Sequence, residues 1–434
     1  MILKKKILIS AYAISPVRGS EYASAWNTVV HLAQQHDLWV IYGMSDDYMG
    51  DTQTMLKYVE DNPMPGVEFI EVQPGRLAKT ITLLDKAGFG WCFYFAYYLW
   101  QKQAYNATLK VLESVDIDVV HQLGPIGFRE PGFLWQLNKP MVWGPIGGMN
   151  VINKKLLNGK PLLTRFKYSV KYMINRVQLN SARVKKAFAQ SGVLIAATKN
   201  GQRTIAEKFN RESYHLPDTS VLNSVSIVTD KFKNIDKQVQ LVWSGSHIAR
   251  KNLEMCLDVL AATDQTNWIL NVLGKGPLTA KLQEKAASLG VSNHIIWHGH
   301  LKRDNAVRVM AGAHLHIITS IAEDNPAVVF EAMSYGVPTL TIDHCGMKDV
   351  VCNHCGIKIS VDDYPVMVSN MSAALNSLLT DPHQLTELAQ TTLKCAHDHC
   401  WDNRLIKLNN IYNDAIVAHH ERFNPSLIQT TLTA

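Results

Sequence analysis

The sequence predicts an α/β protein of two domains, each built on a parallel β-sheet with helices between its strands. Short apolar runs rich in β-branched residues alternate with helix-length segments along the chain, which is the pattern of βα units. The length of 434 residues exceeds that of a usual single domain. With 47% apolar and only 18% charged residues, the chain can form large buried cores, and this excludes disorder as its main state.

The predicted strands form two sets, separated by a segment without helical period. The first set comprises residues 7–11, 38–42, 67–72, 117–121, 140–143 and 193–197; the second comprises residues 239–245, 268–273, 294–297, 314–319 and 337–342. The separating segment, residues 214–229, contains Pro217, Asp218 and Asn223 and reads as the junction. We therefore predict domains over residues 1–222 and 223–400, followed by a helix and tail over residues 401–434.

The positive charge of the chain is concentrated in one stretch. The net charge of +6 divides into +9 for residues 1–222 and −3 for residues 223–434. Between Glu130 and Glu207 there are thirteen Lys and Arg residues and no acid. Within it, residues 153–186 interleave basic and apolar side chains, which is typical of a helix lying on an anionic membrane. The alternative is a solvated helical face. Nucleic acid is not expected, because no recognised nucleic-acid motif accompanies the charge.

The aromatic segment at residues 88–100 contains eight aromatic side chains. Aromatic residues gather at the headgroup level of membranes, so this segment predicts either interfacial contact or a buried helix. No run is long enough to span a bilayer. The basic start at residues 1–6 leads into a strand rather than a long apolar stretch, so we expect no signal peptide and a cytoplasmic chain.

Seven cysteines are expected to be free thiols in a reducing compartment. Two clusters combine cysteine with histidine, namely His344, Cys345, Cys352, His354 and Cys355, and then Cys395, His397, His399 and Cys400. A zinc site needs four converging ligands, and one CxxC pair does not specify them. We therefore predict no metal site, with structural metal binding as the alternative.

The segment that carries the clearest chemistry follows the predicted strand 314–319. Asn325 is suited to cap a helix and Pro326 to its first turn, which would leave the amides of Ala327 and Val328 to bind a phosphate. Glu323 precedes this helix and Glu331 lies within it. Carboxylates do not bind phosphate, but they suit hydroxyls on either side of it, one on a sugar and one on a ribose. The alternatives are a capping carboxylate and a solvated helix face.

This segment resembles glycosyltransferase family 4, whose members are retaining enzymes of the GT-B fold, with two Rossmann-like domains facing across a cleft. The resemblance rests on Glu323 and Glu331 in an E-x7-E spacing, followed by AMSYGVP. It extends to Gly245 with Arg250-Lys251-Asn252, to the GKGP turn at residues 274–277 and to HGHL at residues 298–301. In the first half it extends to RGSE at residues 18–21. The segments REPGFLW at 129–135 and WGPIGG at 143–148 resemble a subgroup associated with bacterial surface polysaccharides.

The resemblance implies a role for each matching residue. Glu331 would bind the donor ribose, Glu323 a hydroxyl of the donor sugar, and Arg250 with Lys251 the leaving diphosphate, where preorganised charge is most effective. The implied donor-binding residues are Gly19, Gly245, Arg250, Lys251, Gly274, Asn325, Ala327, Val328 and Glu331. The implied catalytic residues are Glu323, Arg250, Lys251 and His121.

The chain departs from the family pattern at three places. The residues after Glu323 are not glycine-rich, so the phosphate amides must come from the helix start. Ser246 stands where many members have Arg, so Arg250 would take over its contact. The pocket histidine of the family falls on Leu123, and His121 replaces it as candidate, with a hydrogen-bonded core histidine as the alternative.

We therefore expect a retaining glycosyltransferase that moves a sugar from a UDP- or GDP-linked donor to a growing, lipid-linked surface glycan such as O-antigen, capsule or exopolysaccharide. The resemblance implies no cofactor and no metal. It places the acceptor on the N-terminal domain, the donor on the C-terminal domain, and a last helix crossing back to the first domain. With its basic stretch, the enzyme would be peripheral on the inner membrane face. The competing hypotheses are a GT-B epimerase or phosphorylase, and a two-lobed sugar-binding protein.

Overall fold

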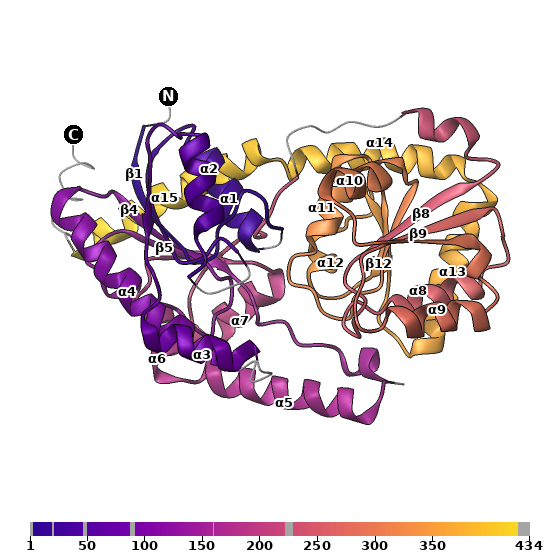
Figure 1. The fold of residues 1–434 in the computed structure, drawn as a ribbon, viewed down its shortest axis with the longest axis horizontal. Coiled ribbons are helices and arrows are strands. Elements are labelled where there is room, and N and C mark those ends of the chain that lie inside the picture. Colours follow the sequence, from indigo (N-terminus) through magenta and orange to yellow (C-terminus); the bar gives the residue numbers. More distant parts are fainter. Residues whose placement is uncertain are drawn as a thin grey trace. The chain divides into compact units, whose positions relative to one another are not determined.

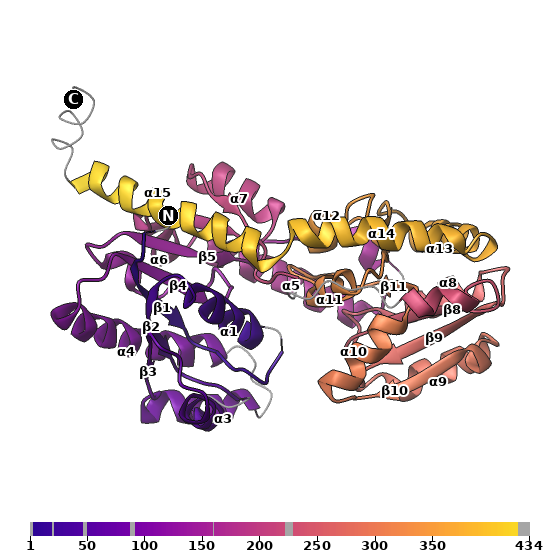
Figure 2. The same ribbon diagram turned by 90° about the horizontal axis from the view of Figure 1, so that it is seen from above.

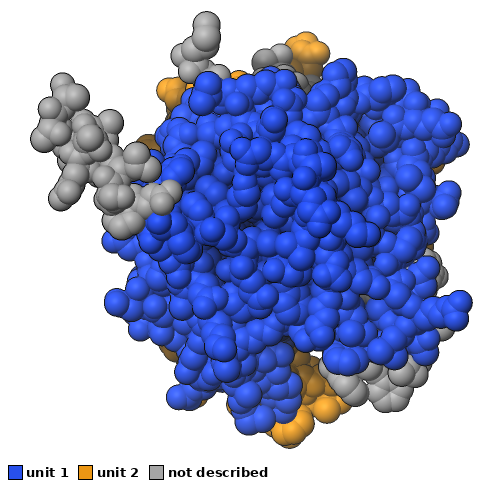
Figure 3. Space-filling model, turned by 90° about the vertical axis from the view of Figure 1, so that its left-hand side faces the viewer, with its two compact units in different colours: residues 1–149, 170–218, 405–434 blue, residues 150–169, 219–404 orange. Residues whose placement is uncertain are grey.

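The computed structural model describes residues 3–19, 21–46, 50–86, 92–158, 160–221 and 229–423. The chain divides into two compact units, which Figure 3 colours separately. Unit 1 contains Met1–Met149, Val170–Asp218 and Leu405–Ala434, and unit 2 contains Asn150–Ser169 and Thr219–Arg404. The predicted boundary between residues 222 and 223 lies outside the described residues. Asn150–Ser169, which the sequence assigned to the N-terminal domain, groups with unit 2.

Unit 1 is built on a seven-stranded sheet in the order β3-β2-β1-β4-β5-β6-β7, and every pairing in it is parallel (Figure 1). Its strands are β1 (Lys6–Ala11), β2 (Asp37–Tyr42), β3 (Val67–Glu71), β4 (Val119–Gly124), β5 (Met141–Ile146), β6 (Val193–Ala196) and β7 (Tyr214–His215). The order reverses between β1 and β4, so this is a doubly wound sheet whose ligand crevice is expected at the carboxyl ends of these strands.

Helices cover both faces of the unit 1 sheet, because the side chains of each strand alternate between two apolar cores. Ile7 and Ile9 of β1 point into one core, and Leu8 into the other. The helices of this unit are α1 (Glu21–Leu32), α2 (Gln53–Asp61), α3 (Arg76–Lys86), α4 (Cys92–Ser114), α6 (Ala182–Gln190) and α7 (Lys199–Phe209). Two further helices, α5 (Leu162–Leu179) and α15 (Trp401–Phe423), cross the division between the units.

Helix α15 is the predicted C-terminal helix, and from Leu405 onward it belongs to unit 1. Its apolar side chains join the core that contains Ile7 and Ile9 of β1. Asn409 of α15 also accepts a buried hydrogen bond of 2.7 Å from His36. The part of α15 from Leu405 to Ala415 therefore contributes to the core of the N-terminal sheet.

Unit 2 contains a six-stranded parallel sheet in the order β10-β9-β8-β11-β12-β13 (Figures 1 and 2). Its strands are β8 (Val239–Ser244), β9 (Trp268–Leu273), β10 (Ile295–Gly299), β11 (Leu315–Ile318), β12 (Thr339–Ile342) and β13 (Gly356–Ile359). Its helices are α8 (Leu253–Ala261), α9 (Thr279–Ser288), α10 (Arg303–Gly312), α11 (Ala327–Ser334), α12 (Cys345–Val350), α13 (Tyr364–Thr380) and α14 (His383–Asp398). Along β8, Leu241 and Trp243 pack under α8 and α13, whereas Val242 points to the other face.

The predicted α/β fold with two parallel sheets is confirmed, and each of the eleven predicted strands forms within a few residues of its expected bounds. Two strands were missed. The edge strand β7 has only two residues, and β13 has four and begins with a glycine, so neither carries the apolar run that indicates a strand.

Part of the aromatic segment at residues 88–100 lies in α4, and residues 88–91 are outside the described residues. Tyr97 and Trp100 are buried, and the indole N–H of Trp100 donates a 2.7 Å bond to the carbonyl of Val72. Phe95 is exposed. The described part is therefore a helix that is buried along one side, at Ala96, Tyr97 and Trp100, and only partly buried elsewhere. None of the described helices combines the length and apolarity needed to cross a bilayer.

Candidate functional site

The predicted donor residues of unit 2 lie at the carboxyl ends of its central strands. Gly245 follows β8, Gly274 follows β9 and Gly299 ends β10. Gly274 has a φ of +105°, and a Cβ atom there would lie 2.1 Å from the carbonyl oxygen of Gly245. Its amide donates a 2.8 Å bond to the carbonyl of Gly299. Only glycine permits this close approach, which draws the three strand ends together.

The loops that follow these glycines are also packed backbone to backbone. A Cβ atom on Gly276 would lie 2.7 Å from the carbonyl oxygen of His247. The Nδ1 atom of His247 hydrogen-bonds to the hydroxyl of Thr279 at 2.8 Å, and its Nε2 atom is buried without a partner among the described residues. The sequence analysis missed His247, because a histidine in a loop carries no distinguishing pattern. Its orphaned nitrogen makes it a further donor-side candidate.

Arg250, Lys251 and Glu323 form one ion cluster. A carboxylate oxygen of Glu323, Oε1, lies 2.5 Å from a guanidinium nitrogen of Arg250 and 2.6 Å from the ammonium nitrogen of Lys251. The side chain of Glu323 is 10% exposed, that of Lys251 16% and that of Arg250 37%. The structure thus brings together three predicted site residues. Arg250 and Lys251 are adjacent, and Glu323 is 73 positions after Arg250 in the sequence.

Backbone contacts hold this cluster in place. The amide of Ile321 donates to the carbonyl of Arg250 at 2.9 Å, and the hydroxyl of Thr319 donates to the carbonyl of Asn252 at 2.8 Å. The guanidinium of Arg250 donates to the carbonyl of Ala322 at 2.8 Å. The loop after β8 and the loop after β11 are therefore joined, and the two cations are preorganised rather than free surface groups.

The start of α11 differs from the prediction. The helix begins at Ala327, and its N-cap residue is Pro326, not Asn325. The amide of Ala327 donates to the carbonyl of Asn325 at 3.0 Å, so it is not the free phosphate donor expected from the sequence. The side-chain amide of Asn325 is buried with neither polar atom paired among the described residues. The amide of Val328 lies in the first turn of α11, where no earlier residue of the helix can supply a carbonyl acceptor.

Glu331 lies in the second turn of α11 and is half-buried. Burial raises the pKa of its carboxyl above the ordinary value, while the nearby charge of Arg303 opposes this shift. This environment does not agree with the alternative prediction that Glu331 lies on a solvated helix face. Glu323 is not a capping carboxylate either, since α11 has no side-chain cap and Glu323 pairs with the two cations.

Two further residues support the loop before α11, and the sequence did not indicate them. A Cβ atom on Gly346, at the start of α12, would lie 1.9 Å from the carbonyl oxygen of Asp324. The amide of Gly346 donates to the carbonyl of Glu323 at 2.8 Å. The side-chain amide of Asn150 donates to the carboxylate of Asp324 at 2.6 Å. Gly346 and Asn150 therefore fix the loop tip on which Glu323 sits.

The two predicted site residues of unit 1 have contrasting environments. Gly19 is exposed in the loop after β1, and a Cβ atom built on it would have nothing within 4 Å. His121 is fully buried in β4, with Nδ1 2.9 Å from the Tyr412 hydroxyl and Nε2 2.8 Å from the Gly144 carbonyl. Its assignment to acceptor chemistry is therefore corrected: both ring nitrogens are occupied, and His121 is a hydrogen-bonded core residue.

A small pocket lies at the carboxyl ends of β1, β4 and β5 in unit 1. Its volume is about 20 Å³, and Glu21 and Asp218 line it together with Ser24 and apolar groups. The sequence analysis did not single out either carboxylate, because each is an isolated acid in its segment. Asp218 fell in the predicted junction, and only the fold brings it beside Glu21.

Comparisons with known proteins identify the class of the second domain. Residues 228–394 match the family model described as Glycosyl transferases group 1. These residues include the whole sheet of unit 2 and most of the site just described, and they are similar to this family. The prediction of a glycosyltransferase domain is therefore confirmed.

Individual proteins agree with this assignment. The chain is 27% identical over 162 residues to the lipopolysaccharide glucosyltransferase WaaG of Escherichia coli, an alignment that covers 36% of this chain and 42% of that enzyme. The chain thus spans less than half the length of this relative. Sucrose-phosphate synthase from Thermosynechococcus elongatus has a similar structure, with a TM-score of 0.66, 14% identity, and coverage of 96% of this chain and 100% of that one.

A third similar structure is Anabaena Alr3699/HepE in complex with UDP-glucose. Its TM-score is 0.59 at 14% identity, with coverage of 95% of this chain and 100% of that chain. At such low identity these likenesses show the fold alone. The fold is GT-B, as expected from the sequence.

Because the backbone at Gly274 lies so close to Gly245, replacing Gly274 should lower the unfolding free energy more than replacing a glycine with free space around it. In Gly274→Ala the new methyl group meets the Gly245 carbonyl as well as an unfavourable φ, so we expect unfolding free energy to fall by about 3 kcal/mol. Gly290→Ala is the matched control, because Gly290 also has a positive φ, of +73°, but nothing within 4 Å of its Cβ position. It should cost only about 1 kcal/mol. Equal shifts of the urea midpoint in the two variants would contradict this.

The raised pKa of Glu331 predicts that its ionised carboxylate destabilises the folded protein at neutral pH. The folded carboxyl has a pKa above its unfolded value, so the folded state loses stability as pH rises through these values. Glu331→Gln should therefore stabilise the ligand-free protein at about pH 7, and the gain should vanish at about pH 4. Urea midpoints at the two pH values measure this. Glu284→Gln on α9, an exposed position, should show no such pH-dependent gain.

Proposed function

We propose that this protein is a retaining glycosyltransferase that moves a sugar from a nucleotide-sugar donor to a growing, lipid-linked surface glycan. The observation that carries the proposal is the ion cluster of Arg250, Lys251 and Glu323 at the strand ends of a group 1 glycosyl transferase domain. Two fixed cations beside glycine-lined strand ends suit a diphosphate, because no side chain there obstructs the approach of its oxygens.

In this proposal the diphosphate replaces Glu323 as the partner of the two cations. The carboxylate holds both cations in one place before the donor arrives. When the diphosphate binds, Glu323 is released towards a hydroxyl of the donor sugar. Arg250 and Lys251 then face the charge that develops on the leaving phosphate, where preorganised cations contribute most to catalysis.

Glu331 is the proposed ribose ligand. Its carboxylate is half-buried in α11, and its raised pKa marks a charged group without full compensation in the ligand-free protein. Two ribose hydroxyls would supply the missing hydrogen bonds. The amide of Val328 in the first turn of α11, together with the positive end of the helix dipole, would contact a phosphate oxygen.

Related proteins support a UDP-linked donor and a lipopolysaccharide-type acceptor. The curated relative from Escherichia coli is named a lipopolysaccharide glucosyltransferase, and the Anabaena structure holds UDP-glucose. We propose that the acceptor hydroxyl attacks from the face that the phosphate leaves, and that the departing phosphate oxygen takes its proton. The side chains of Arg250 and Lys251 supply the positive charge, so the proposed reaction needs no metal.

The test is nucleotide binding by two glutamate variants. Glu331→Ala should weaken UDP and UDP-sugar binding alike, by roughly 1.5–3 kcal/mol, which is roughly 10- to 150-fold in Kd. Glu323→Ala should retain UDP binding or tighten it, because Arg250 and Lys251 lose their competing anion, while sugar transfer to an added glycan acceptor falls. Calorimetry against UDP, GDP and dTDP, followed by the same nucleotides carrying sugars, measures the binding.

Glu284→Ala, an exposed carboxylate on α9, is the control and should change neither binding nor transfer. If Glu331→Ala folds and binds UDP as the unmodified protein does, the ribose role is wrong. If both glutamate variants lose UDP equally, the division of roles between them is wrong. Binding of no nucleoside diphosphate by the unmodified protein would overturn the proposed function.

We also propose that α5 docks the protein on the inner face of an anionic membrane. The helix has 18 residues, none of them buried. At about 100° per residue, six of its exposed apolar side chains fall within an arc of roughly 120°, and Tyr172, 48% exposed, lies outside this arc. The six are Leu162 at 79% exposure, Leu163 at 64%, Phe166 at 65%, Met173 at 60%, Ile174 at 46% and Val177 at 67%.

Cations flank this apolar arc on both sides. Arg165 and Arg176 border one edge and Lys167 the other, and all three are exposed. The opposite side of the helix, with Tyr168 and Leu179, is partly buried against the protein. An apolar stripe bordered by cations and backed by protein is the arrangement of an interfacial helix, with apolar groups among acyl chains and cations at headgroup level.

This predicts salt-dependent binding to anionic vesicles. Each cation near an anionic leaflet contributes about 1 kcal/mol, which salt screens. The triple substitution of Arg165, Lys167 and Arg176 by Gln should therefore lower partitioning about 100-fold. Sedimentation with vesicles of phosphatidylglycerol and phosphatidylcholine at low and high salt measures it.

The matched control replaces Lys185, Lys186 and Arg203 by Gln, which removes the same charge from exposed positions outside α5. It should leave vesicle binding nearly unchanged. If both triple variants lost vesicle binding equally, the binding would depend on the net charge of the protein and not on the cations of α5. Equal partitioning of the unmodified protein onto neutral and anionic vesicles would contradict the electrostatic part of the proposal.

A further inference from the structure

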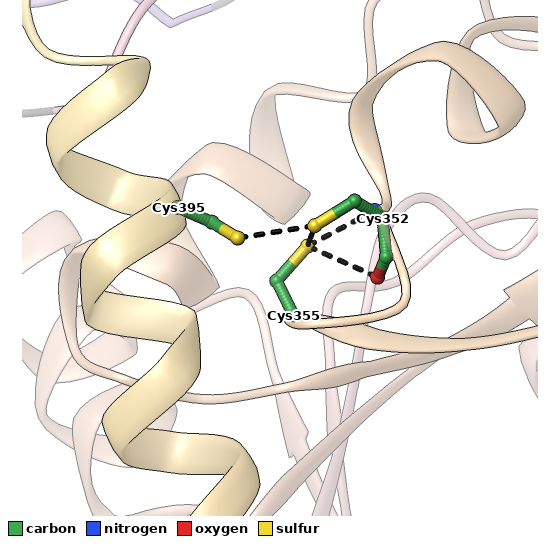
Figure 4. Close-up of side chains that lie close together, drawn as sticks. All are labelled: Cys352, Cys355 and Cys395. Atoms are coloured by element: carbon green, nitrogen blue, oxygen red, sulfur yellow. Dashed lines mark hydrogen bonds between the residues drawn. The ribbon is translucent and has the colours of Figure 1, made fainter.

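Three cysteines that lie far apart in the sequence meet in unit 2. Cys352 and Cys355 lie in the turn between α12 and β13, and Cys395 lies on α14 (Figure 4). The sulfur of Cys352 is 3.0 Å from that of Cys395 and 3.4 Å from that of Cys355. All three sulfurs lie within 4.8 Å of one another. The fold thus joins Cys395, from the second Cys/His cluster of the sequence, to the CxxC pair of the first cluster.

These separations suit coordination of one ion. A tetrahedral zinc ion with Zn–S bonds of ~2.3 Å places its sulfur ligands ~3.8 Å apart. The separations of 3.0 and 3.4 Å from Cys352 are somewhat shorter than that value, so small side-chain rotations would bring the sulfurs to the ligand positions. The sulfurs are all farther apart than the ~2.05 Å of a disulfide, and the three residues are free cysteines.

The backbone of the turn supports a thiolate. The amide of Cys355 donates to the carbonyl of Cys352 at 3.1 Å and closes the turn. The amide of Cys352 donates to the sulfur of Cys355 at 3.2 Å. Burial opposes ionisation of Cys352, but hydrogen bonds from the thiol of Cys395 and from the amides of His354 and Cys355 hold its pKa below the ordinary value. Amide donors to sulfur stabilise the negative charge that a metal-bound thiolate carries.

The surroundings of the three thiols combine a packed side with an open side. Cys355 is buried in a cluster with Phe330 of α11 and Val350 of α12, and its pKa is raised by this burial. Cys352 and Cys395 are partly exposed. An ion could therefore enter from solvent and find two thiols there, with the third fixed from behind. Burial raises the pKa of Cys395 to about 12, so in the metal-free protein it is a thiol.

We propose that Cys352, Cys355 and Cys395 bind one thiophilic metal ion, with Zn²⁺ as the ion and solvent as the fourth ligand. On binding, each thiol that is still protonated releases its proton to solvent, and three Zn–S bonds form without any change of oxidation state. The ion would tie α14 to the turn before β13. Since α14 packs against α11, which carries Glu331, this bond also supports the donor helix. The proposal does not depend on the sugar transferred or on the acceptor.

The experiment titrates the reduced, chelator-stripped full chain with Co²⁺ and then with Zn²⁺. Cobalt should bind at one equivalent per chain with an intense thiolate-to-metal charge-transfer band, and zinc should displace it. Zinc should protect these three cysteines, and no others, from alkylation, as read by mass spectrometry of peptides; this measurement needs no variant. Zinc should also raise the melting temperature of the unmodified protein.

Cys395→Ser should lower the zinc affinity at least 100-fold and abolish the melting-temperature shift. Cys400→Ser is the matched control, a free cysteine five residues further on and outside the cluster, and should bind zinc as the unmodified protein does. The proposal is overturned if the reduced protein takes up no Co²⁺ or Zn²⁺, or if zinc leaves the alkylation of all three cysteines unchanged. It is equally overturned if the two variants lose affinity to the same extent.

Discussion

The site of unit 2 depends on one electrostatic constraint, the pairing of a single carboxylate with two cations. Glu323 lies 2.5 Å from Arg250 and 2.6 Å from Lys251, and its side chain is only 10% exposed. Two like charges held side by side in a half-buried position repel each other and lose solvent, so they need an anion between them. In the ligand-free protein Glu323 is that anion. In the proposed function a diphosphate takes the place of Glu323, because it meets the same requirement with more charge.

The constraint holds only because the backbone around it is rigid. Gly274, after β9, approaches the backbone of Gly245, after β8, within a distance that no Cβ atom allows, and the amide of Gly346 fixes the carbonyl of Glu323 from the side of α12. Helix α11 leaves this loop, and α14 packs against it. The three thiols at the junction of α14 with the turn before β13 would extend the same support, since a bound ion would add bonds beside the apolar contacts of these helices.

The apolar face of α5 raises a separate question, namely what covers exposed apolar side chains that the core of the protein does not bury. A helix with no buried residue gains little from the core of its own protein, and its exposed leucines, phenylalanine and methionine are unfavourable in water. The flanking cations and the absence of acids over that part of the sequence indicate where the missing apolar contact would come from. The proposed donor site and the proposed membrane-binding helix thus use different residues, and each can be disabled separately.

Much of the fold could be predicted because local patterns carry it. Apolar runs of five or six residues marked the parallel strands, since a strand buried on both faces needs apolar side chains throughout. Glu323, Glu331, Arg250 and Lys251 were singled out by their resemblance to a family motif, and the loops that carry Glu323, Arg250 and Lys251 follow strands, where parallel sheets bind ligands. The edge strands β7 and β13 were too short to produce such a run.

The tertiary structure decided the properties of side chains whose partners are distant in the sequence. His121 is a core residue because Tyr412 and the Gly144 carbonyl occupy both of its nitrogens. Asn325 does not cap α11, and Glu323 pairs with two cations from another loop. Cys352, Cys355 and Cys395 converge although 43 residues separate the first from the last. The sequence by itself determined which chemical groups follow which strands; packing alone decided their partners, because burial and pairing depend on contacts that no local pattern records.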